Sequence, residues 1–284
     1  SAEVMEVMEV MEILVFICVG IFTGLSAGLL GVGGGIVSVP AMVILLPYFD
    51  VPQSLVMHIA IATSLLLIIP TSIVSAYSHS RNNAIVWPSV VLMLPGLIAG
   101  GLIGAYAVIL SERELLQTVF SILLFLIAMY MLFGKTRKVS KKKTGKYELK
   151  DKSSLIDHFF SWGAFIIASL IGAISSLMGV GGGTMTVPYL VWRGITLPNA
   201  IGTSAFCGLP IAVSSSLLFF LSHVEKSQTE NPGFIYLPAF SGILIGAMIF
   251  TPIGAKLTHR LDVLILKKVF VVTLLAVSVK LLFS

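Results

Sequence analysis

Two runs of glycine, one in each half of the chain, interrupt stretches of apolar residues. Leu-Leu-Gly-Val-Gly-Gly-Gly covers 29–35, and Leu-Met-Gly-Val-Gly-Gly-Gly covers 177–183, at an offset of 148 residues. Non-helical backbone is tolerated at membrane depth only where it is buried in protein or lines a cavity. A helix that begins after each run, near Ile36 and near Thr184, would direct its free N–H groups and about half a unit of positive charge at the bilayer centre. The pattern predicts an anion-binding substrate site formed by Gly33, Gly34, Gly35, Gly181, Gly182 and Gly183.

The glycines have two other interpretations, helix packing and nucleotide binding. Small residues that let helices pack closely recur every four positions, as Gly20, Gly24 and Gly28 do, whereas the two runs are clustered. Neither run ends in the Gly-Lys-Ser/Thr of a phosphate-binding ATPase loop, and no strand precedes either one. Broken helices at matching positions of two repeats are instead typical of a transporter's substrate site.

A Thr-Ser pair lies early in the apolar segment that follows each glycine run. Thr63-Ser64 and Thr203-Ser204 are related by an offset of 140. Their hydroxyls could donate hydrogen bonds to substrate oxygens, or each could bond a carbonyl of its own helix. We include all four residues in the predicted substrate site. Prolines also recur in both halves and should kink their helices, either as hinges or as fixed bends; the candidate hinges are Pro40, Pro70, Pro188 and Pro210.

Asp, Glu, Lys and Arg are absent from the middle of every apolar segment. An anion site would therefore have to use amides and hydroxyls, and the carboxylate relay that is usual in proton-coupled carriers is missing. His58 and His79 flank the second segment, where we expect interfacial histidines. The two cysteines, Cys18 and Cys207, indicate neither a disulfide framework nor a metal site. We find no catalytic constellation and expect no enzyme activity, no cofactor and no metal.

The composition predicts an all-α polytopic membrane protein. The chain is 57% hydrophobic and 11% charged, its mean hydropathy is +1.02, and a soluble domain would carry about 25% charged residues. The net charge of +5 does not indicate a nucleic-acid partner, because nine of the 18 Lys and Arg residues lie in 135–152. The Glu-Val-Met triplets before residue 13 are expected to form a frayed leader. Apolar segments are expected at 13–47, 55–77, 87–110, 113–133, 155–192, 198–222, 234–257 and 263–283.

These segments form a duplicated unit. We expect a first repeat at 13–133, a basic cytoplasmic loop at 134–154 and a second repeat at 155–283, each repeat with four segments. If the glycine-broken segment crosses the membrane once, the repeats run parallel; if it enters and returns, or crosses twice, they are inverted. The inverted arrangement places 15 Lys and Arg residues on one side and 3 on the other. The positive-inside rule therefore favours inversion, with both termini outside.

The glycine motifs resemble the duplicated motif of the TauE/SafE sulfite exporter family, also called the toluene-sulfonate uptake permease family. The likeness rests on 28–40 and 176–188, together with Ala-Thr-Ser at 62–64 and Gly-Thr-Ser at 202–204, and it extends over roughly 13–283. The resemblance implies a carrier of the bacterial or archaeal inner membrane that moves sulfite, sulfonates or related sulfur-containing anions.

We therefore expect a multi-pass secondary transporter of small sulfur oxyanions in the prokaryotic inner membrane, working by alternating access in the direction of export. The alternative is an anion channel, because two broken helices could also line a pore. Its partners would be the anion and the lipid bilayer. The sequence leaves open the coupling ion, and whether the chain acts alone or as a homo-oligomer.

Overall fold

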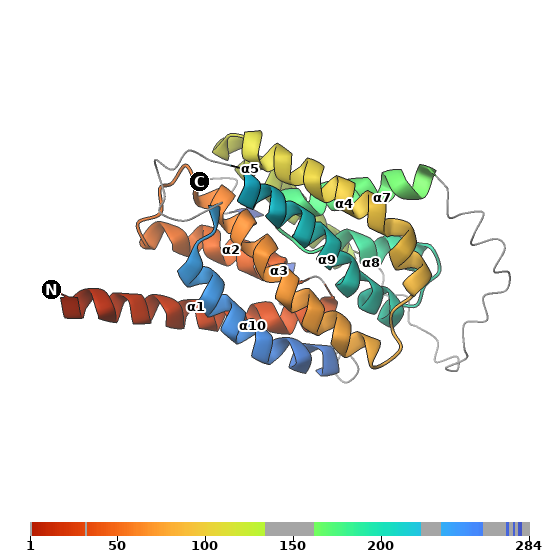
Figure 1. The fold of residues 1–284 in the computed structure, drawn as a ribbon, viewed down its shortest axis with the longest axis horizontal. Helices are drawn as coiled ribbons and strands as arrows, with labels where there is room; N and C mark the ends of the chain where they lie inside the picture. The colour runs from red at the N-terminus through yellow and green to blue at the C-terminus, as the bar shows by residue number, and fades with distance from the viewer. Residues whose placement is uncertain are drawn as a thin grey trace.

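In a computed structural model, the described residues are 2–31, 33–133, 162–222, 234–257 and five positions between 271 and 279. They form helices with no strand among them, which confirms the all-α prediction (Figure 1). The predicted loop 134–154 and most of the predicted segment 263–283 lie outside these residues. The helices are α1 (Ala2–Leu30), α2 (Gly35–Leu45), the short 3-10 helix η1 (Leu46–Tyr48), α3 (Val56–Ser80), α4 (Trp87–Leu110), α5 (Arg113–Phe133), α7 (Trp162–Leu177), α8 (Gly183–Trp192), α9 (Leu197–Leu221) and α10 (Leu237–Leu257).

The glycine-broken segment of the first half enters and returns. α1 begins at Ala2, so the Glu-Val-Met triplets lie inside this helix and the predicted frayed leader is wrong; Glu and Met are both good helix formers. α2 then runs back along α1: Gly34, just before α2, abuts Thr23, and the ring of Phe49, just after it, lies 5.6 Å from that of Phe16. α2 and α8 have only 11 and 10 residues. Each is about 16 Å long, roughly half the thickness of a bilayer's hydrocarbon core.

The duplication is visible in the helices themselves. α3 and α9 both have 25 residues, and each carries a proline, Pro70 and Pro210, at positions related by the 140-residue offset. The succession of buried and exposed positions along 61–80 recurs along 201–220 with a single difference. The two helices therefore occupy equivalent positions in equivalent surroundings, as a duplicated unit requires.

The two halves are inverted. α1 packs along α10 in the same direction, with Gly20 against Ile243, Gly24 against Ala247 and Gly28 against Thr251. α3 also runs with α1, because Tyr236 contacts Glu12 and Thr63 near the start of both helices and Ser75 contacts Ala27 near the end of both. α4 returns after the short loop 81–86 and is antiparallel to α1. Since α10 is the counterpart of α4 yet runs parallel to α1, one half is turned over relative to the other.

α4 and α7 form the pair that corresponds, in the inverted arrangement, to α10 and α1. Gly96 lies against Ala168, and Gly104 lies against Ala173. The first helix of each half thus packs on a helix of the other half (Figure 1). A β-carbon at any of these glycines would meet the partner helix at less than contact distance. The small residues that recur every four positions, such as Gly20, Gly24 and Gly28, therefore form packing faces between the halves.

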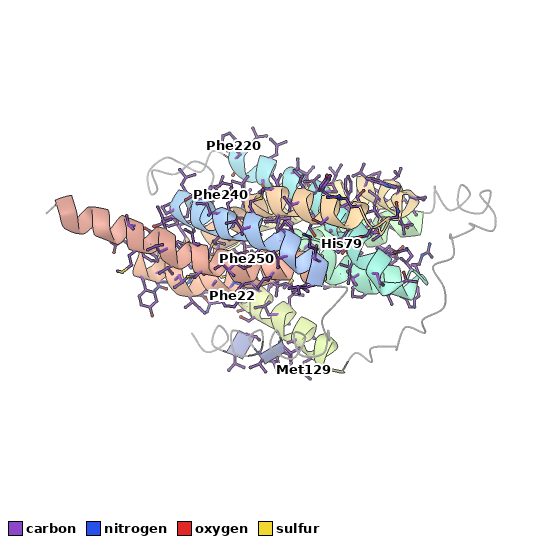
Figure 2. All side chains as sticks on the ribbon, turned by 90° about the horizontal axis from the view of Figure 1, so that it is seen from below. Phe22, His79, Met129, Phe220, Phe240 and Phe250 are labelled. Atoms are coloured by element: carbon purple, nitrogen blue, oxygen red, sulfur yellow. The ribbon has the colours of Figure 1, made fainter. Side chains whose placement is uncertain are left out.

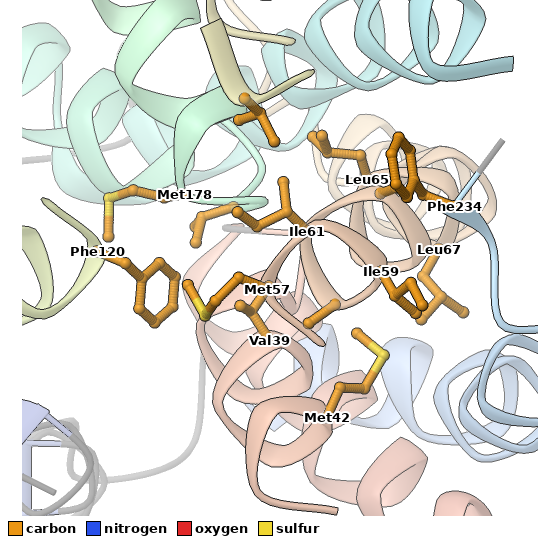
Figure 3. Packing of buried hydrophobic residues seen from close by; sticks show 14 of the residues in the cluster. Val39, Met42, Met57, Ile59, Ile61, Leu65, Leu67, Phe120, Met178 and Phe234 are labelled. Carbon is orange, nitrogen blue, oxygen red and sulfur yellow. The ribbon is translucent and has the colours of Figure 1, made fainter. Parts of the chain in front are cut away.

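Five of the described helices are long and apolar enough to cross a membrane: Val10–Leu29, Val56–Ser80, Trp87–Leu110, Pro198–Leu221 and Leu237–Leu257. Large apolar side chains such as Phe22 and Phe220 are 65% and 60% exposed and point away from the helices (Figure 2), which fits a lipid-facing surface. α3 and α9 are the most buried of the five. Val39 and Met42 of α2 pack against the apolar side chains of α3 in the core (Figure 3).

Candidate substrate site

The two glycine breaks meet where α3 packs on α9. Gly35, the first residue of α2, lies so close to Gly179 that a β-carbon there would overlap the Gly179 carbonyl oxygen. Gly33 lies against Ile68 of α3, and Gly181 lies beside Gly208 of α9. The predicted glycines 33–35 and 181–183 are all buried. α2 and α8 therefore begin close together inside the protein.

The two breaks begin with the same backbone conformation and differ at the glycines that follow. Gly31 and Gly179 both adopt the left-handed conformation, with φ of 64° and 61°. The N–H groups of Gly179 and the next residue bond back to the last turn of α7 at 3.0 and 2.9 Å, which closes that helix in a Schellman motif. Gly33 and Gly34 also have positive φ, whereas φ at Gly182 is −46°. Glycine at Gly182 is therefore needed for space and not for backbone conformation.

The predicted serines bind the breaks of the opposite half. Ser64 Oγ donates to the carbonyl oxygen of Gly179 at 2.7 Å, and Ser204 Oγ donates to the carbonyl oxygen of Gly31 at 3.2 Å. Helix ends leave such carbonyls without an intrahelical partner. Ser204 also lies 2.9 Å from a carbonyl of its own helix. In this conformation the two serine hydroxyls tie the halves together across the breaks.

The predicted threonines also connect the halves. Thr63 Oγ1 accepts a hydrogen bond from the N–H of Tyr236 at 3.0 Å, and Thr203 Oγ1 accepts one from the N–H of Val86 at 2.9 Å. Tyr236 and Val86 are the residues that precede α10 and α4. Because the halves are inverted, the two contacts lie toward opposite ends of the helices. We call the pair the threonine latches.

The N–H groups at the starts of α2 and α8 have no acceptor in the described part of the chain. The first turns are closed by bonds from Val37 and Ser38 to Gly34 and from Thr186 to Gly182, which leaves the preceding N–H groups without an intrahelical partner. Neither helix has a side-chain cap. Each start carries about half a unit of positive charge, so both breaks present donors and positive potential to the protein interior.

Other hydroxyls around the breaks were missed by the sequence interpretation. Ser38 Oγ shares a hydrogen bond of 2.8 Å with Ser64, and Thr71 Oγ1 donates toward the carbonyl oxygen of Gly33 at 3.1 Å. Ser72 Oγ and Thr186 Oγ1 are buried without a hydrogen-bond partner in the described structure. The 148-residue offset relates Ser38 to Thr186 as it relates the glycines, and it could have identified them. Nothing in the sequence distinguishes Ser72 from the other serines of α3.

The four prolines lie inside helices α2, α3, α8 and α9. Pro40 and Pro188 both stand at the sixth residue of their half-helix, and Pro70 and Pro210 follow the Thr-Ser pairs. Each removes one backbone donor from its helix. Whether they act as hinges stays a prediction.

Charged side chains lie away from the breaks. The described Lys and Arg residues beyond α1 stand at the ends of helices: Arg81, Arg113, Arg193 and Lys256. His58 and His79 occupy the first and last turns of α3 and are 7% and 1% exposed, so protein covers both side chains; their position at the membrane interface stays a prediction. Among the described residues no three His, Cys, Asp or Glu side chains are grouped to hold a metal ion.

Inverted repeats, spanning helices and two half-helices that begin together at the centre define a membrane transporter. The sequence profile of the family described as Sulfite exporter TauE/SafE matches residues 16–281. The chain belongs to this family.

Curated relatives agree with this class. A protein named "Probable membrane transporter protein" from Haemophilus influenzae is 36% identical over 94% of this chain and 96% of its own length. The probable membrane transporter YunE of Bacillus subtilis is 27% identical over 91% and 94%, and one from Methanocaldococcus jannaschii is 24% identical over 87% of each. No solved structure is a match to the chain. Family and relatives are transporters and not enzymes.

Proposed function

We propose that the protein is a secondary transporter that exports small sulfur oxyanions, sulfite or sulfonates, across the prokaryotic inner membrane by alternating access. One observation carries the proposal: the uncapped starts of α2 and α8 lie close together, buried between two inverted halves. Backbone amides at helix starts bind oxyanions without a side-chain cation. The family name supports the sulfur-containing cargo.

The arrangement of the halves supports alternating access. A site shared by inverted repeats can be opened to either side if one repeat rocks against the other. The threonine latches join the halves toward opposite ends of the helices, and both are closed in this structure. Opening one end while the other stays latched would expose the site to one side at a time. The glycines 33–35 and 181–183 would hold the anion, with the Thr-Ser pairs closing around it.

Flux through purified protein in liposomes tests the proposal. We expect saturable sulfite or sulfonate uptake that is accelerated by the same anion on the opposite side of the membrane. A screen of sulfite, sulfoacetate, taurine, thiosulfate and sulfate as competitors identifies the cargo. Current that rises with concentration without saturation would contradict a carrier and indicate an anion channel. A lack of flux for every sulfur anion would contradict the proposal altogether.

A further inference from the structure

We infer that the site accepts a singly charged oxyanion in preference to a doubly charged one, and that Ser72 and Thr186 bind it directly. The inference rests on the proposed function, and it adds two contact residues and a charge preference. It starts from two of the hydroxyls around the glycine breaks that are buried without a partner in the described structure.

Ser72 and Thr186 approach the breaks from two different helices. Thr186 Oγ1 of α8 lies 3.3 Å from the position that a β-carbon on Gly182 would occupy. Ser72 Oγ of α3 lies 3.1 Å from the corresponding position on Gly208, and the backbone nitrogen of Gly182 lies 3.6 Å from that same point. Ser72 Oγ is also 3.4 Å from the β-carbon position of Gly33. The two hydroxyls therefore adjoin both breaks and the start of α8.

Both hydroxyls are almost fully buried and lack a partner. Ser72 is 1% exposed and Thr186 is 0% exposed. The usual solution for a buried hydroxyl in a helix is a bond to a carbonyl of the same helix, and Thr71 and Thr251 adopt it at 2.9 and 2.7 Å. A buried hydroxyl without a partner is costly. An oxyanion between the breaks would accept from both hydroxyls and remove that cost.

A single negative charge is the most that the protein can offset there. The starts of α2 and α8 each supply about half a unit of positive charge, and the ends of α1 and α7 at the same breaks supply negative partial charge, so the net positive charge does not exceed about one unit. The ionisable groups near the site include Cys207, next to Gly208 on α9, and His79, two turns beyond Ser72 with Nε2 at 3.2 Å from the Gly28 carbonyl oxygen. The Lys and Arg residues in the described part of the chain stand at helix ends. Desolvating a dianion costs about four times as much as a monoanion of equal size, because the cost scales with the square of the charge. Sulfonates and bisulfite meet this requirement, and sulfate does not.

Equilibrium binding to the purified full-length protein tests the charge preference with three probes of similar size. We expect methanesulfonate, a monoanion, to bind at least about tenfold more tightly than sulfate at pH 7.5. Methylphosphonate should bind less tightly as rising pH converts it to a dianion, whereas methanesulfonate keeps its charge and reports any titration of the protein itself. Equal affinities for methanesulfonate and sulfate would overturn the charge preference while leaving a transporter in place. Absence of sulfur-anion flux would instead overturn the proposed function and this inference with it.

Two variants test the contact residues. Ser72→Ala and Thr186→Val remove one hydroxyl each at nearly constant volume, and each should weaken methanesulfonate binding by about tenfold or more. Thermal stability without ligand should stay equal or rise, because an unpaired buried hydroxyl is removed. Ser216→Ala is the matched control, since Ser216 Oγ is also buried without a partner but is not adjacent to the breaks; it should bind normally. Normal binding by both site variants, or equal loss in the control, would overturn the assignment.

Discussion

Ser64 in the first half donates a hydrogen bond of 2.7 Å to the carbonyl oxygen of Gly179 in the second half. The inverted counterpart runs from Ser204 to Gly31. In each case the acceptor belongs to the left-handed glycine that ends the first helix of the other half. The glycine breaks are thus held in place by the opposite repeat, so the two half-sites cannot form independently of each other.

Removing either serine hydroxyl should destabilise the protein. Ser64→Ala leaves the Gly179 carbonyl oxygen buried without this donor, at a cost of about 1–3 kcal/mol, and Ser204→Ala should cost less because its bond is longer. Thermal unfolding in detergent measures the difference. Ser214→Ala is a suitable control, since Ser214 bonds only its own helix in the described structure. Unfolding temperatures equal to wild type for Ser64→Ala would show that the bond across the halves contributes nothing.

The threonine latches should have opposite effects on accessibility. Thr63→Val removes the acceptor for the Tyr236 N–H, and Thr203→Val removes the acceptor for the Val86 N–H. Each change should weaken closure at one end only, so one variant should favour the outward-open state and the other the inward-open state. Labelling of single cysteines introduced on the two sides measures this. If both variants changed labelling on the same side, the latches would not be the two gates.

The sequence predicted the all-α fold, the duplication and the inversion, because apolar length, repeated motifs and loop charges each report one of them directly. It could not distinguish a broken segment that enters and returns from one that crosses twice, because both give inverted halves. Glycines mark a break, but its angle depends on which residues take positive φ, as Gly31, Gly33 and Gly34 do. Which residues do so depends on packing against Thr23 of the preceding helix and against Ile201, which is remote in sequence.

Only part of the candidate site could be predicted, because the residues that complete it come from the other half of the chain. The Thr-Ser pairs were found from their recurrence, but their partners lie in the other half, so no local pattern could show that Ser64 bonds Gly179. Ser72 has no repeated counterpart, since residue 212 is alanine. That its hydroxyl lacks a hydrogen-bond partner can be seen only in the folded structure, where α9 and both breaks surround it.

Tyr236 should make the free energy of unfolding depend on pH in the alkaline range. Burial, a hydrogen bond of 2.6 Å to Glu12 and the charges of Glu12 and Asp50 raise the pKa of the Tyr236 hydroxyl above its usual value. An unfolded tyrosine ionises near pH 10, so above that pH the unfolded chain loses a proton that the folded protein keeps. Stability should therefore fall as pH rises above about 10. Thermal unfolding between pH 9 and 11 should show a shallower fall for Tyr236→Phe than for wild type, with the exposed Tyr48→Phe as control; equal slopes would contradict this coupling.

Gly182→Ala gives the most direct test of the central claim that the glycine breaks hold the anion. With φ of −46°, the backbone at Gly182 accepts alanine. The new methyl group would stand 2.8 Å from the flexible end of Ile211 and 3.3 Å from Thr186 Oγ1, in the proposed site. Ser216→Ala, which alters a buried side chain that is not adjacent to the breaks, controls for a general effect of substitution. Sulfite counterflow in proteoliposomes should be abolished in Gly182→Ala while the variant remains folded, and retained in Ser216→Ala; wild-type counterflow in Gly182→Ala would show that the breaks serve packing alone.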